Sequence, residues 1–240
     1  MEGGHAMVIA RMKFEKGEEV RYISHLDLQR TFQRALRRAQ IDTAYSQGFN
    51  PHSKISFAMA LPVGMTSEGE YVDVELNHPT CAKKLMDQLN TSLPEGLKIL
   101  DCKISQGNHP SLMSIIQKGL YWVKIYTQNF IDPDQIEKKI VDFLDQKEIK
   151  IQKKDKKGRV KGKNIRPFID EISMEKVEEQ FIYLKMKLSA GSQNNVKPEI
   201  VVERLTSFGQ PPLEYNGVKI HRIDLLAQDG ERFISPMELF

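Results

Sequence analysis

The sequence lacks most of the features that identify membrane, secreted and cluster-binding proteins. Cys81 and Cys102 are its only cysteines, too few for a disulfide framework or for a cysteine-ligated cluster. No apolar run approaches the roughly 20 residues that cross a bilayer, and no secretory signal pattern begins the chain. We therefore expect a cytosolic protein.

Several cofactor and catalytic motifs are also missing. The sequence has no P-loop, no G-x-G-x-x-G, no G-x-S-x-G and no H-E-x-x-H. Glu68, Glu70 and Glu75 are close in sequence, but their spacing does not define a carboxylate pair, and no nucleophile stands beside an evident base. We expect no cofactor and no metal, and the sequence favours a protein that is not an enzyme.

The charge of the chain is unevenly distributed. Its 240 residues, 40% of them hydrophobic, suffice for one large domain or two small ones, and the formal net charge is only +3. Residues 150–166 nevertheless hold seven Lys and two Arg against one Asp. A basic segment in an otherwise acidic chain indicates a localised anionic partner.

Hydrophobic periodicity predicts an α+β fold. In the first half we expect helices at 24–39 and 80–93, and strands at 8–14, 20–23, 41–46, 55–61, 71–76 and 97–104. Without the two short strands, this order is β-α-β-β-α-β, which is typical of the ferredoxin-like fold.

The same pattern begins again after a polar connector at 105–118. We expect helices at 132–145 and 197–208, and strands at 121–127, 149–154, 159–165, 181–190 and 218–226. The strands at 149–154 and 159–165 are expected to form a hairpin. The sequence thus predicts duplicated ferredoxin-like units, with antiparallel sheets and helices packed on one face. The expected domains are 7–104 and 119–240, and residues 1–6, which show no periodicity, are left out.

The first helix carries a cluster of arginines. Ser24 and Asp27 form a capping-box pattern at its start. At about 100° per residue, the side opposite the apolar residues holds Arg30, Arg34, Arg37 and Arg38. Guanidinium groups match phosphate oxygens bidentately, so this side suits an anionic partner. The alternative is an ordinary solvated helix face.

A polar loop follows the first helix. It offers short polar, cationic and aromatic groups for a nucleotide: Tyr45, Ser46, Asn50, His52 and Lys54. Gly48 permits a positive φ angle. The alternative is a tight turn, and we expect Phe49 to be buried in the core.

Two histidines and a basic hairpin complete the candidate residues. His25 and His52 are weak candidates for a general base, although a hydrogen-bonded structural role is more common. The predicted hairpin offers these cations for contacts with phosphates: Lys153, Lys154, Lys156, Lys157, Arg159, Lys161, Lys163 and Arg166. A solubilising edge hairpin is the alternative.

Several long runs resemble the radical SAM-linked (radical SAM-associated) family of unknown function. The runs are Arg21-Tyr-Ile-Ser-His-Leu-Asp-Leu-Gln-Arg30, Phe32-Gln-Arg-Ala-Leu-Arg-Arg-Ala39, Ala44-Tyr-Ser-Gln-Gly-Phe-Asn-Pro-His-Ser-Lys-Ile-Ser-Phe57, Leu61-Pro-Val-Gly64 and Glu70-Tyr71. The resemblance covers residues 8–104. The second half matches through Asn164-Ile-Arg-Pro167 and Lys197-Pro-Glu199, and the family shows an acidic residue where this chain has Asn164.

The resemblance implies an accessory protein that works with a radical SAM enzyme encoded nearby. Two cysteines 21 residues apart cannot hold the cluster of such an enzyme, so this chain is not the enzyme itself. The family's gene neighbourhood, near ribosomal-protein and ribonuclease genes, points to RNA metabolism. The predicted fold is also distantly similar to the RAMP-type CRISPR RNA-binding proteins.

These observations lead to one main hypothesis and two alternatives. The main hypothesis is an accessory RNA-binding protein that presents tRNA or rRNA to a radical SAM enzyme. The alternatives are a metal-independent endoribonuclease of the RAMP type and a protein-only adaptor of the radical SAM enzyme.

Overall fold

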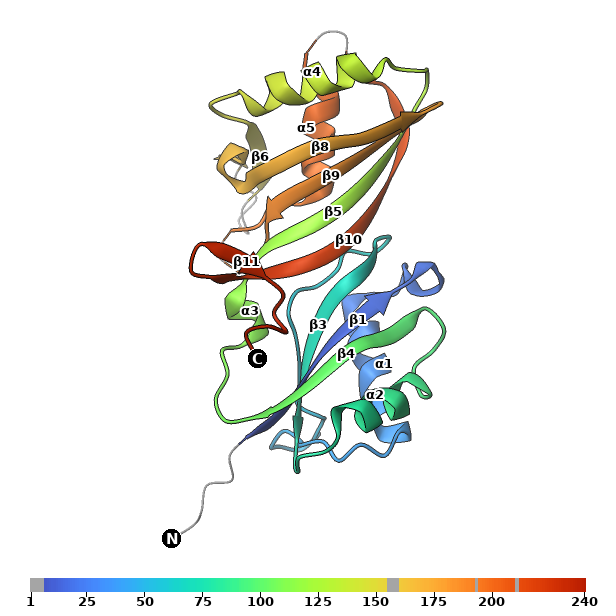
Figure 1. Cartoon of the computed structure of the whole chain (residues 1–240), viewed down its shortest axis with the longest axis vertical. Helices are drawn as coiled ribbons and strands as arrows, with labels where there is room; N and C mark the ends of the chain where they lie inside the picture. Colours follow the sequence, from blue (N-terminus) through green and yellow to red (C-terminus); the bar gives the residue numbers. More distant parts are fainter. Residues whose placement is uncertain (1–6, 155–159, 193, 210–211) are drawn as a thin grey trace. The chain divides into compact units, whose positions relative to one another are not determined.

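The computed structural model describes residues 7–154, 160–192, 194–209 and 212–240, which form two compact units (Figure 1). Unit 1 contains the chain up to Gln117 together with Arg222–Phe240, and unit 2 contains Lys118–His221. Strand β10 (Tyr215–Asp229) begins in unit 2 and ends in unit 1. The sequence led us to expect domains at 7–104 and 119–240 joined by a connector at 105–118, whereas this division assigns residues 105–117 and 222–240 to unit 1.

Unit 1 has the β-α-β-β-α-β order that the sequence predicts. Its elements are β1 (Val8–Lys16), α1 (His25–Arg38), β2 (Ile55–Phe57), β3 (Thr66–Leu76), α2 (Ala82–Asn90) and β4 (Leu97–Gln106). The strands lie in the order β4-β1-β3-β2, and these three pairings are antiparallel. The short elements are η1 (Glu18–Val20), α3 (Leu112–Ile115) and β11 (Arg232–Ile234), and β10 pairs with both β3 and β11.

The core of unit 1 lies between its sheet and its two helices. Every second residue of β1 faces α1 and α2, and the core includes three phenylalanine rings. The Phe14 and Phe32 ring centroids are 5.0 Å apart, and Phe57 lies 5.3 Å from Phe32. Burying one such ring contributes about 1.5–3 kcal/mol. These contacts fix α1 against the sheet and leave its opposite side to solvent.

Unit 2 repeats this architecture. Its elements are β5 (Ile116–Thr127), α4 (Pro133–Leu144), β8 (Ile169–Glu178), β9 (Phe181–Ser189), α5 (Pro198–Ser207) and the start of β10. The sheet order β10-β5-β9-β8 corresponds to β4-β1-β3-β2 in unit 1. Ile125 on β5, Ile140 on α4 and Leu205 on α5 border one small cavity, so both helices pack on the same face of this sheet. The predicted α+β class with antiparallel sheets is confirmed.

The basic hairpin lies apart from the main sheet of unit 2. Strands β6 (Lys150–Lys154) and β7 (Val160–Asn164) pair only with each other among the described strands, and η2 (Arg166–Phe168) follows them. The strand that pairs with the other edge of β9, opposite β5, is β8, which we did not predict. Its sequence, IDEISMEKVE, is rich in charge, and two register shifts interrupt its alternation.

Two short predicted strands are wrong. Residues 20–23 belong to η1 and a turn, where the Lys16 ammonium donates hydrogen bonds to the carbonyls of Arg21 and Ile23. These carbonyls thus have partners without a neighbouring strand. Residues 41–46 form only the isolated bridges of Thr43 with Leu76 and of Tyr45 with Ser53.

The face of the unit 1 sheet opposite α1 and α2 is covered by other segments of unit 1. Arg11, only 1% exposed, donates to both carboxylate oxygens of Asp73 at 2.8 and 2.9 Å. It also donates to the carbonyls of Pro110 and Pro236, and its guanidinium stacks 4.5 Å from the Phe240 ring. The residues around Pro110 and the C-terminal residues are therefore fastened to β1. In the described chain, no helix is long and apolar enough to span a membrane.

Candidate functional site

Helix α1 begins as its sequence predicts. The Asp27 amide donates to Ser24 Oγ at 3.2 Å, and the Ser24 hydroxyl donates to the Asp27 carboxylate at 2.7 Å. These contacts satisfy a helix-terminal amide and place a negative charge at the positive end of the helix. The start of α1 is thereby fixed.

A buried ionic cluster supports the segment that leads into α1. The Arg222 guanidinium donates to both carboxylate oxygens of Glu70 at 2.8 and 3.0 Å, and both side chains are 3% exposed. Burial lowers the pKa of Lys16, and the nearby Glu70 carboxylate counteracts this effect. Because Lys16 also holds the carbonyls of Arg21 and Ile23, the cluster sets the entry of the chain into the helix.

A groove of about 610 Å³ lies between α1 and the loop that follows it. The helix contributes Leu26, Gln29, Arg30, Gln33 and Arg37, and the loop contributes Tyr45, Asn50, Pro51, His52 and Ser53. A volume of this size falls in the range of small-ligand sites, about 300–1,000 Å³. We call this feature the groove.

The loop of the groove is closed by hydrogen bonds at its base. The Ser46 amide donates to the His52 carbonyl at 2.9 Å, and the His52 amide donates to Ser46 Oγ at 3.2 Å. Below them, the buried Thr43 hydroxyl donates to the Ser53 hydroxyl at 2.9 Å. These contacts hold the Tyr45 and His52 side chains at the groove.

The charge of the groove is positive. Two of its lining residues are arginines, and none is an aspartate or a glutamate. Arg30 lies 3.4 Å from Asp27, an exposed contact that contributes little binding energy. Within the described residues, the guanidinium groups of Arg34 and Arg37 have no hydrogen-bond or ion-pair partner. Arg30 and Arg37 therefore present cationic groups to the groove, and Arg34 lies exposed on the same helix.

Two of the predicted cations have partners within unit 1. Arg38 donates to the Ser92 carbonyl at 2.7 Å, in the segment that follows α2. Lys54 forms an ion pair of 2.9 Å with Glu75. Neither residue lines the groove. Of the predicted loop residues, Tyr45, Asn50 and His52 line it, whereas Ser46 supports His52 from beneath.

Phe49 is not a core residue, and our expectation that it is buried is wrong. Its side chain is fully exposed at the tip of the loop. The turn depends on Gly48, which has a φ angle of 126°. This conformation is costly for other residues and turns the chain sharply, so the next ring projects outward. An exposed ring beside a positive groove is a surface on which a nucleic acid base can stack.

The two histidines occupy different environments. His52 is exposed in the groove, with Nδ1 3.1 Å from Ser46 Oγ. His25 packs edge-on against Phe57, with ring centroids 5.4 Å apart, and its buried Nδ1 has no hydrogen-bond partner among the described residues. Only His52 lines the groove. The described part of the chain contains no group of three or more His, Cys, Asp or Glu side chains arranged to hold a metal ion.

The cations of the hairpin are only partly described. Lys156, Lys157 and Arg159 lie outside the described residues, as do the side chains of Lys153, Lys154 and Lys161. The Lys163 ammonium lies 4.5 Å from the centroid of the Phe168 ring. Arg166 donates to the carbonyls of Leu144 and Ile169 at 2.6 and 2.9 Å. It thus joins α4 to the start of β8.

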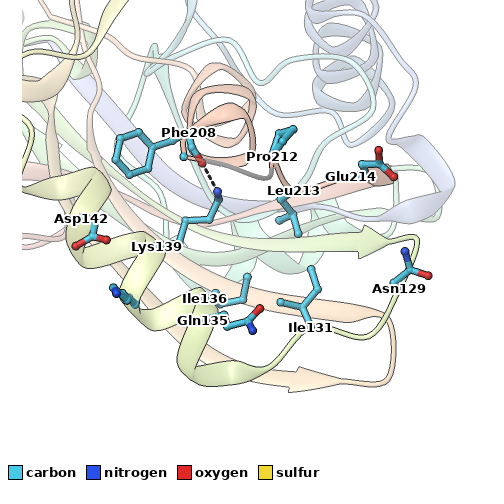
Figure 2. Close-up of a pocket in the computed structure, with 12 residues that line it drawn as sticks. Asn129, Ile131, Gln135, Ile136, Lys139, Asp142, Phe208, Pro212, Leu213 and Glu214 are labelled. Atoms are coloured by element: carbon cyan, nitrogen blue, oxygen red, sulfur yellow. Dashed lines mark hydrogen bonds between the residues drawn. The ribbon is translucent and has the colours of Figure 1, made fainter.

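A second cavity of about 610 Å³ lies in unit 2, between α4 and residues 208–209 and 212–214 (Figure 2). Figure 2 shows the Lys139 ammonium directed at the carbonyl of Phe208, to which it donates a hydrogen bond. Burial lowers the pKa of Lys139. Ile136 and Leu213 provide apolar lining. Because the Lys139 ammonium donates to the Phe208 carbonyl, we assign this lysine a role in fastening the end of α5 to α4.

The groove includes residues that our sequence analysis overlooked. Gln29 and Gln33 add two side-chain amides to the groove beside the arginines, where they can donate to and accept from a base or a sugar. Leu26, Gln29, Arg30, Gln33 and Arg37 follow one helical stripe. The helical period alone therefore contained this signal.

A protein-family model described as "Uncharacterized protein conserved in bacteria (DUF2344)" matches residues 10–198 of the chain. No curated protein matches the chain. Among solved structures, the chain is similar to a chain of a Cbf5–Nop10–Gar1 complex, with 9% identity and a TM-score of 0.49, over 90% of this chain and 48% of that one.

Two further structures show a similar likeness. One is an H/ACA RNP bound to a substrate RNA containing 2'-deoxyuridine, with 8% identity and a TM-score of 0.45 over 89% of this chain and 46% of that one. The other is an archaeal box H/ACA sRNP Nop10–Cbf5 complex, with 9% identity and a TM-score of 0.43 over the same shares. The chain thus spans about half the length of the chains it matches.

Proposed function

Because the chain belongs to DUF2344, a family of uncharacterised proteins conserved in bacteria, we propose its function from its own surface: an accessory RNA-binding protein of the cytoplasm. In this proposal the groove of unit 1 binds a structured RNA, such as a tRNA or an rRNA segment. The protein presents this RNA to a separately encoded radical SAM enzyme.

The observation that carries the proposal is the composition of the groove. Arg30 and Arg37 provide forked donors for phosphate oxygens, and no carboxylate lines the groove to compete for them. Tyr45 is 46% exposed and offers a ring for stacking. The amides of Gln29 and Gln33 suit the polar edge of a base. Phosphate, base edge and base face thus each have a matching group within one groove.

RNA binding is tested by fluorescence anisotropy with labelled tRNA over a salt series. The variant Arg30→Glu/Arg37→Glu is expected to bind at least about tenfold more weakly, and its log–log salt slope should fall by about two. The control variant Lys83→Glu/Arg232→Glu makes the same charge change at side chains that are 78% and 79% exposed elsewhere in unit 1. Equal weakening in both variants, or in neither, would contradict the proposal.

The radical SAM partner is supported by the resemblance of residues 8–104 to the radical SAM-linked family. The two cysteines of this chain fit an accessory role, because they cannot hold the cluster of such an enzyme. Co-purification with the enzyme, before and after nuclease treatment, tests the partnership. Association that is lost after nuclease treatment indicates an RNA bridge. Association that survives it, together with absent tRNA binding, indicates the protein-only adaptor instead.

A second candidate function is a metal-independent endoribonuclease, favoured by one observation. His52 is an exposed imidazole in the groove, and Ser46 fixes its ring through Nδ1. A histidine so oriented can act as a general base toward a ribose 2′-hydroxyl. Incubating RNA with wild type and His52→Ala in the presence of a chelator tests this function. Cleavage by wild type alone supports it, whereas equal or absent cleavage contradicts it.

A further inference from the structure

The unit 2 sheet has one face that α4 and α5 do not cover. These helices pack against the side of β5 and β9 that includes Ile125 and Leu184. Strand alternation places the intervening residues on the other side. There Trp122 is 57% exposed and Tyr126 is 38% exposed. We call this side the open face.

Aromatic and cationic side chains alternate in register across the open face. On the paired strands β5 and β9, Trp122 lies opposite Lys185, Lys124 opposite Tyr183, and Tyr126 opposite Phe181. The Tyr126 and Phe181 rings are 5.2 Å apart between centroids. The open face therefore has an aromatic pair at one end and a single indole about 13 Å along the same strand, at about 3.3 Å per residue.

Lysine ammonium groups already cover two of these rings. Lys124 Nζ lies 3.7 Å from the Phe181 ring centroid and 5.1 Å from that of Tyr183. Lys176 on β8 covers Tyr183 at 4.7 Å. The ring face that an ammonium covers is also the face on which a nucleic acid base can stack. An ammonium displaced by that base remains close enough to contact the phosphate of the same nucleotide. Trp122 is the ring most exposed to a base directly.

The charge of the open face selects among possible partners. On the three strands, four lysines and two glutamates are in register either with these rings or, for Lys187 and Glu171, with each other, namely Lys124, Lys176, Lys185, Lys187, Glu171 and Glu178. Glu178 is paired with Lys176 at 2.7 Å. An apolar protein partner would bury the lysines without compensation, which is costly. A single-stranded nucleic acid matches both features, because its bases offer π faces to the rings and each nucleotide carries one negative charge for the lysines.

We infer that the open face of unit 2 is a second RNA-binding site, which takes single-stranded RNA by stacking bases on Trp122 and on the Tyr126–Phe181 pair. Lys124 and Lys185 contact the phosphates. The inference rests on the proposed function for the choice of RNA as ligand. It adds a division of labour, in which the groove holds structured RNA through phosphates and the open face holds an unpaired segment through its bases.

The test uses the fluorescence of Trp122, the only tryptophan of the chain. The full-length protein is titrated with oligouridylate of about ten nucleotides, a length in the range that stacking platforms accommodate. We expect saturable quenching. Tyr126→Ala should weaken binding at least about fivefold, the lower end of the effect of one lost stacking contact. Lys185→Glu should also weaken binding at least about fivefold, because it replaces a phosphate contact with a like charge. The control Tyr22→Ala, which removes a ring 68% exposed in unit 1, should leave the titration unchanged.

Two comparisons separate failure of this inference from failure of the proposed function. An abasic oligonucleotide of equal length should bind at least about fivefold more weakly than oligouridylate, and equal binding would overturn the stacking site. Arg30→Glu/Arg37→Glu should lose tRNA binding but keep the quenching of Trp122. If wild type binds tRNA while oligouridylate causes no quenching, the open face is not an RNA site and the proposed function stands. If oligouridylate quenches Trp122 while tRNA binding fails, the open face stands and the groove does not.

Discussion

The two sheets of this protein share one topology but differ in the face that their helices leave uncovered. In unit 1 this face is closed: Arg11 and Tyr71 are each 1% exposed beneath the C-terminal residues. In unit 2 the equivalent face leaves Trp122 57% exposed. Polar residues in a closed face stabilise the fold, whereas polar and aromatic residues in an open face are available to a ligand. The equivalent face of the sheet is therefore structural in unit 1, whereas in unit 2 we propose that it binds a ligand.

The arginines of unit 1 show the same contrast within a single unit. Arg11 and Arg222 are buried, and each donates to both oxygens of one carboxylate. Arg30 and Arg37 line a groove without carboxylates. Removing a buried arginine should lower stability, and removing a groove arginine should lower RNA affinity. This separation can be tested from its largest expected effect to its smallest.

The largest effect is expected at Arg11. Arg11→Met keeps much of the side-chain volume but leaves the nearly buried Asp73 carboxylate without its partner. Loss of one member of a buried ion pair costs about 3–5 kcal/mol of unfolding free energy. Urea unfolding measures the change. Lys185→Met on the open face is the matched control and should change stability by no more than about 0.5 kcal/mol. Equal losses would show that the open face is also structural.

A smaller effect is expected where β3 and β10 approach each other. A Cβ atom at Gly69 would lie 2.4 Å from the Cα of Asp224 and 2.4 Å from the carbonyl oxygen of Ile223, which are backbone atoms. Gly69→Ala should therefore destabilise the protein by about 1–3 kcal/mol. The control is Gly217→Ala on strand β10, where an added Cβ atom would meet no atom within 4 Å. A destabilisation by Gly217→Ala as large as that by Gly69→Ala would contradict the packing described for unit 1.

The smallest effect concerns the hydroxyl of Tyr71. It donates to Asp224 at 2.6 Å and lies 3.1 Å from the Ser235 hydroxyl, so Tyr71→Phe leaves two polar groups with one partner fewer. The expected loss is about 1–1.5 kcal/mol at neutral pH, measured by urea unfolding. Tyr126→Phe on the open face, where no hydrogen bond of the hydroxyl is described, should be close to neutral.

Tyr71 also predicts a dependence on alkaline pH. Burial and the Asp224 carboxylate raise its pKa above the ordinary value of about 10. The folded protein thus holds the phenolic proton above the pH at which the unfolded chain releases it. The contribution to stability is complete below about pH 10 and is lost as the pH rises further. Unfolding free energies between about pH 9 and 11 should fall more steeply for wild type than for Tyr71→Phe, and parallel curves would contradict the closed face.

The sequence predicted the features that depend on neighbouring residues. The start of α1 follows from Ser24 and Asp27, and its buried side follows from the spacing of Leu28 and Phe32. Both signals lie within a few turns of one helix. The candidate residues Arg30, Tyr45 and His52 all line the groove for the same reason, because the loop follows the helix closely and lies beside it, although the sequence did not predict a groove.

Features that depend on distant segments could not be predicted in this way. Strand β5 alternates Tyr, Trp, Val, Lys, Ile and Tyr, so both of its faces look apolar, and only the packing of α4 and α5 shows that Trp122 lies outside. Arg11 is buried because residues more than 200 positions later cover it. Phe49 looked like a core residue because large apolar side chains usually are, whereas the turn at Gly48 directs it outward.

The most direct test of the central claim is photo-crosslinking of RNA to the full-length protein, followed by mapping of the crosslinked residues. The claim is that RNA contacts two surfaces, the groove of unit 1 and the open face of unit 2. It predicts crosslinks at Tyr45 or Phe49 with structured RNA, and at Trp122 or Tyr126 with single-stranded RNA. Crosslinks confined to other surfaces would contradict it. So would crosslinks at the groove and the open face that persist at wild-type yield in both Arg30→Glu/Arg37→Glu and Tyr126→Ala.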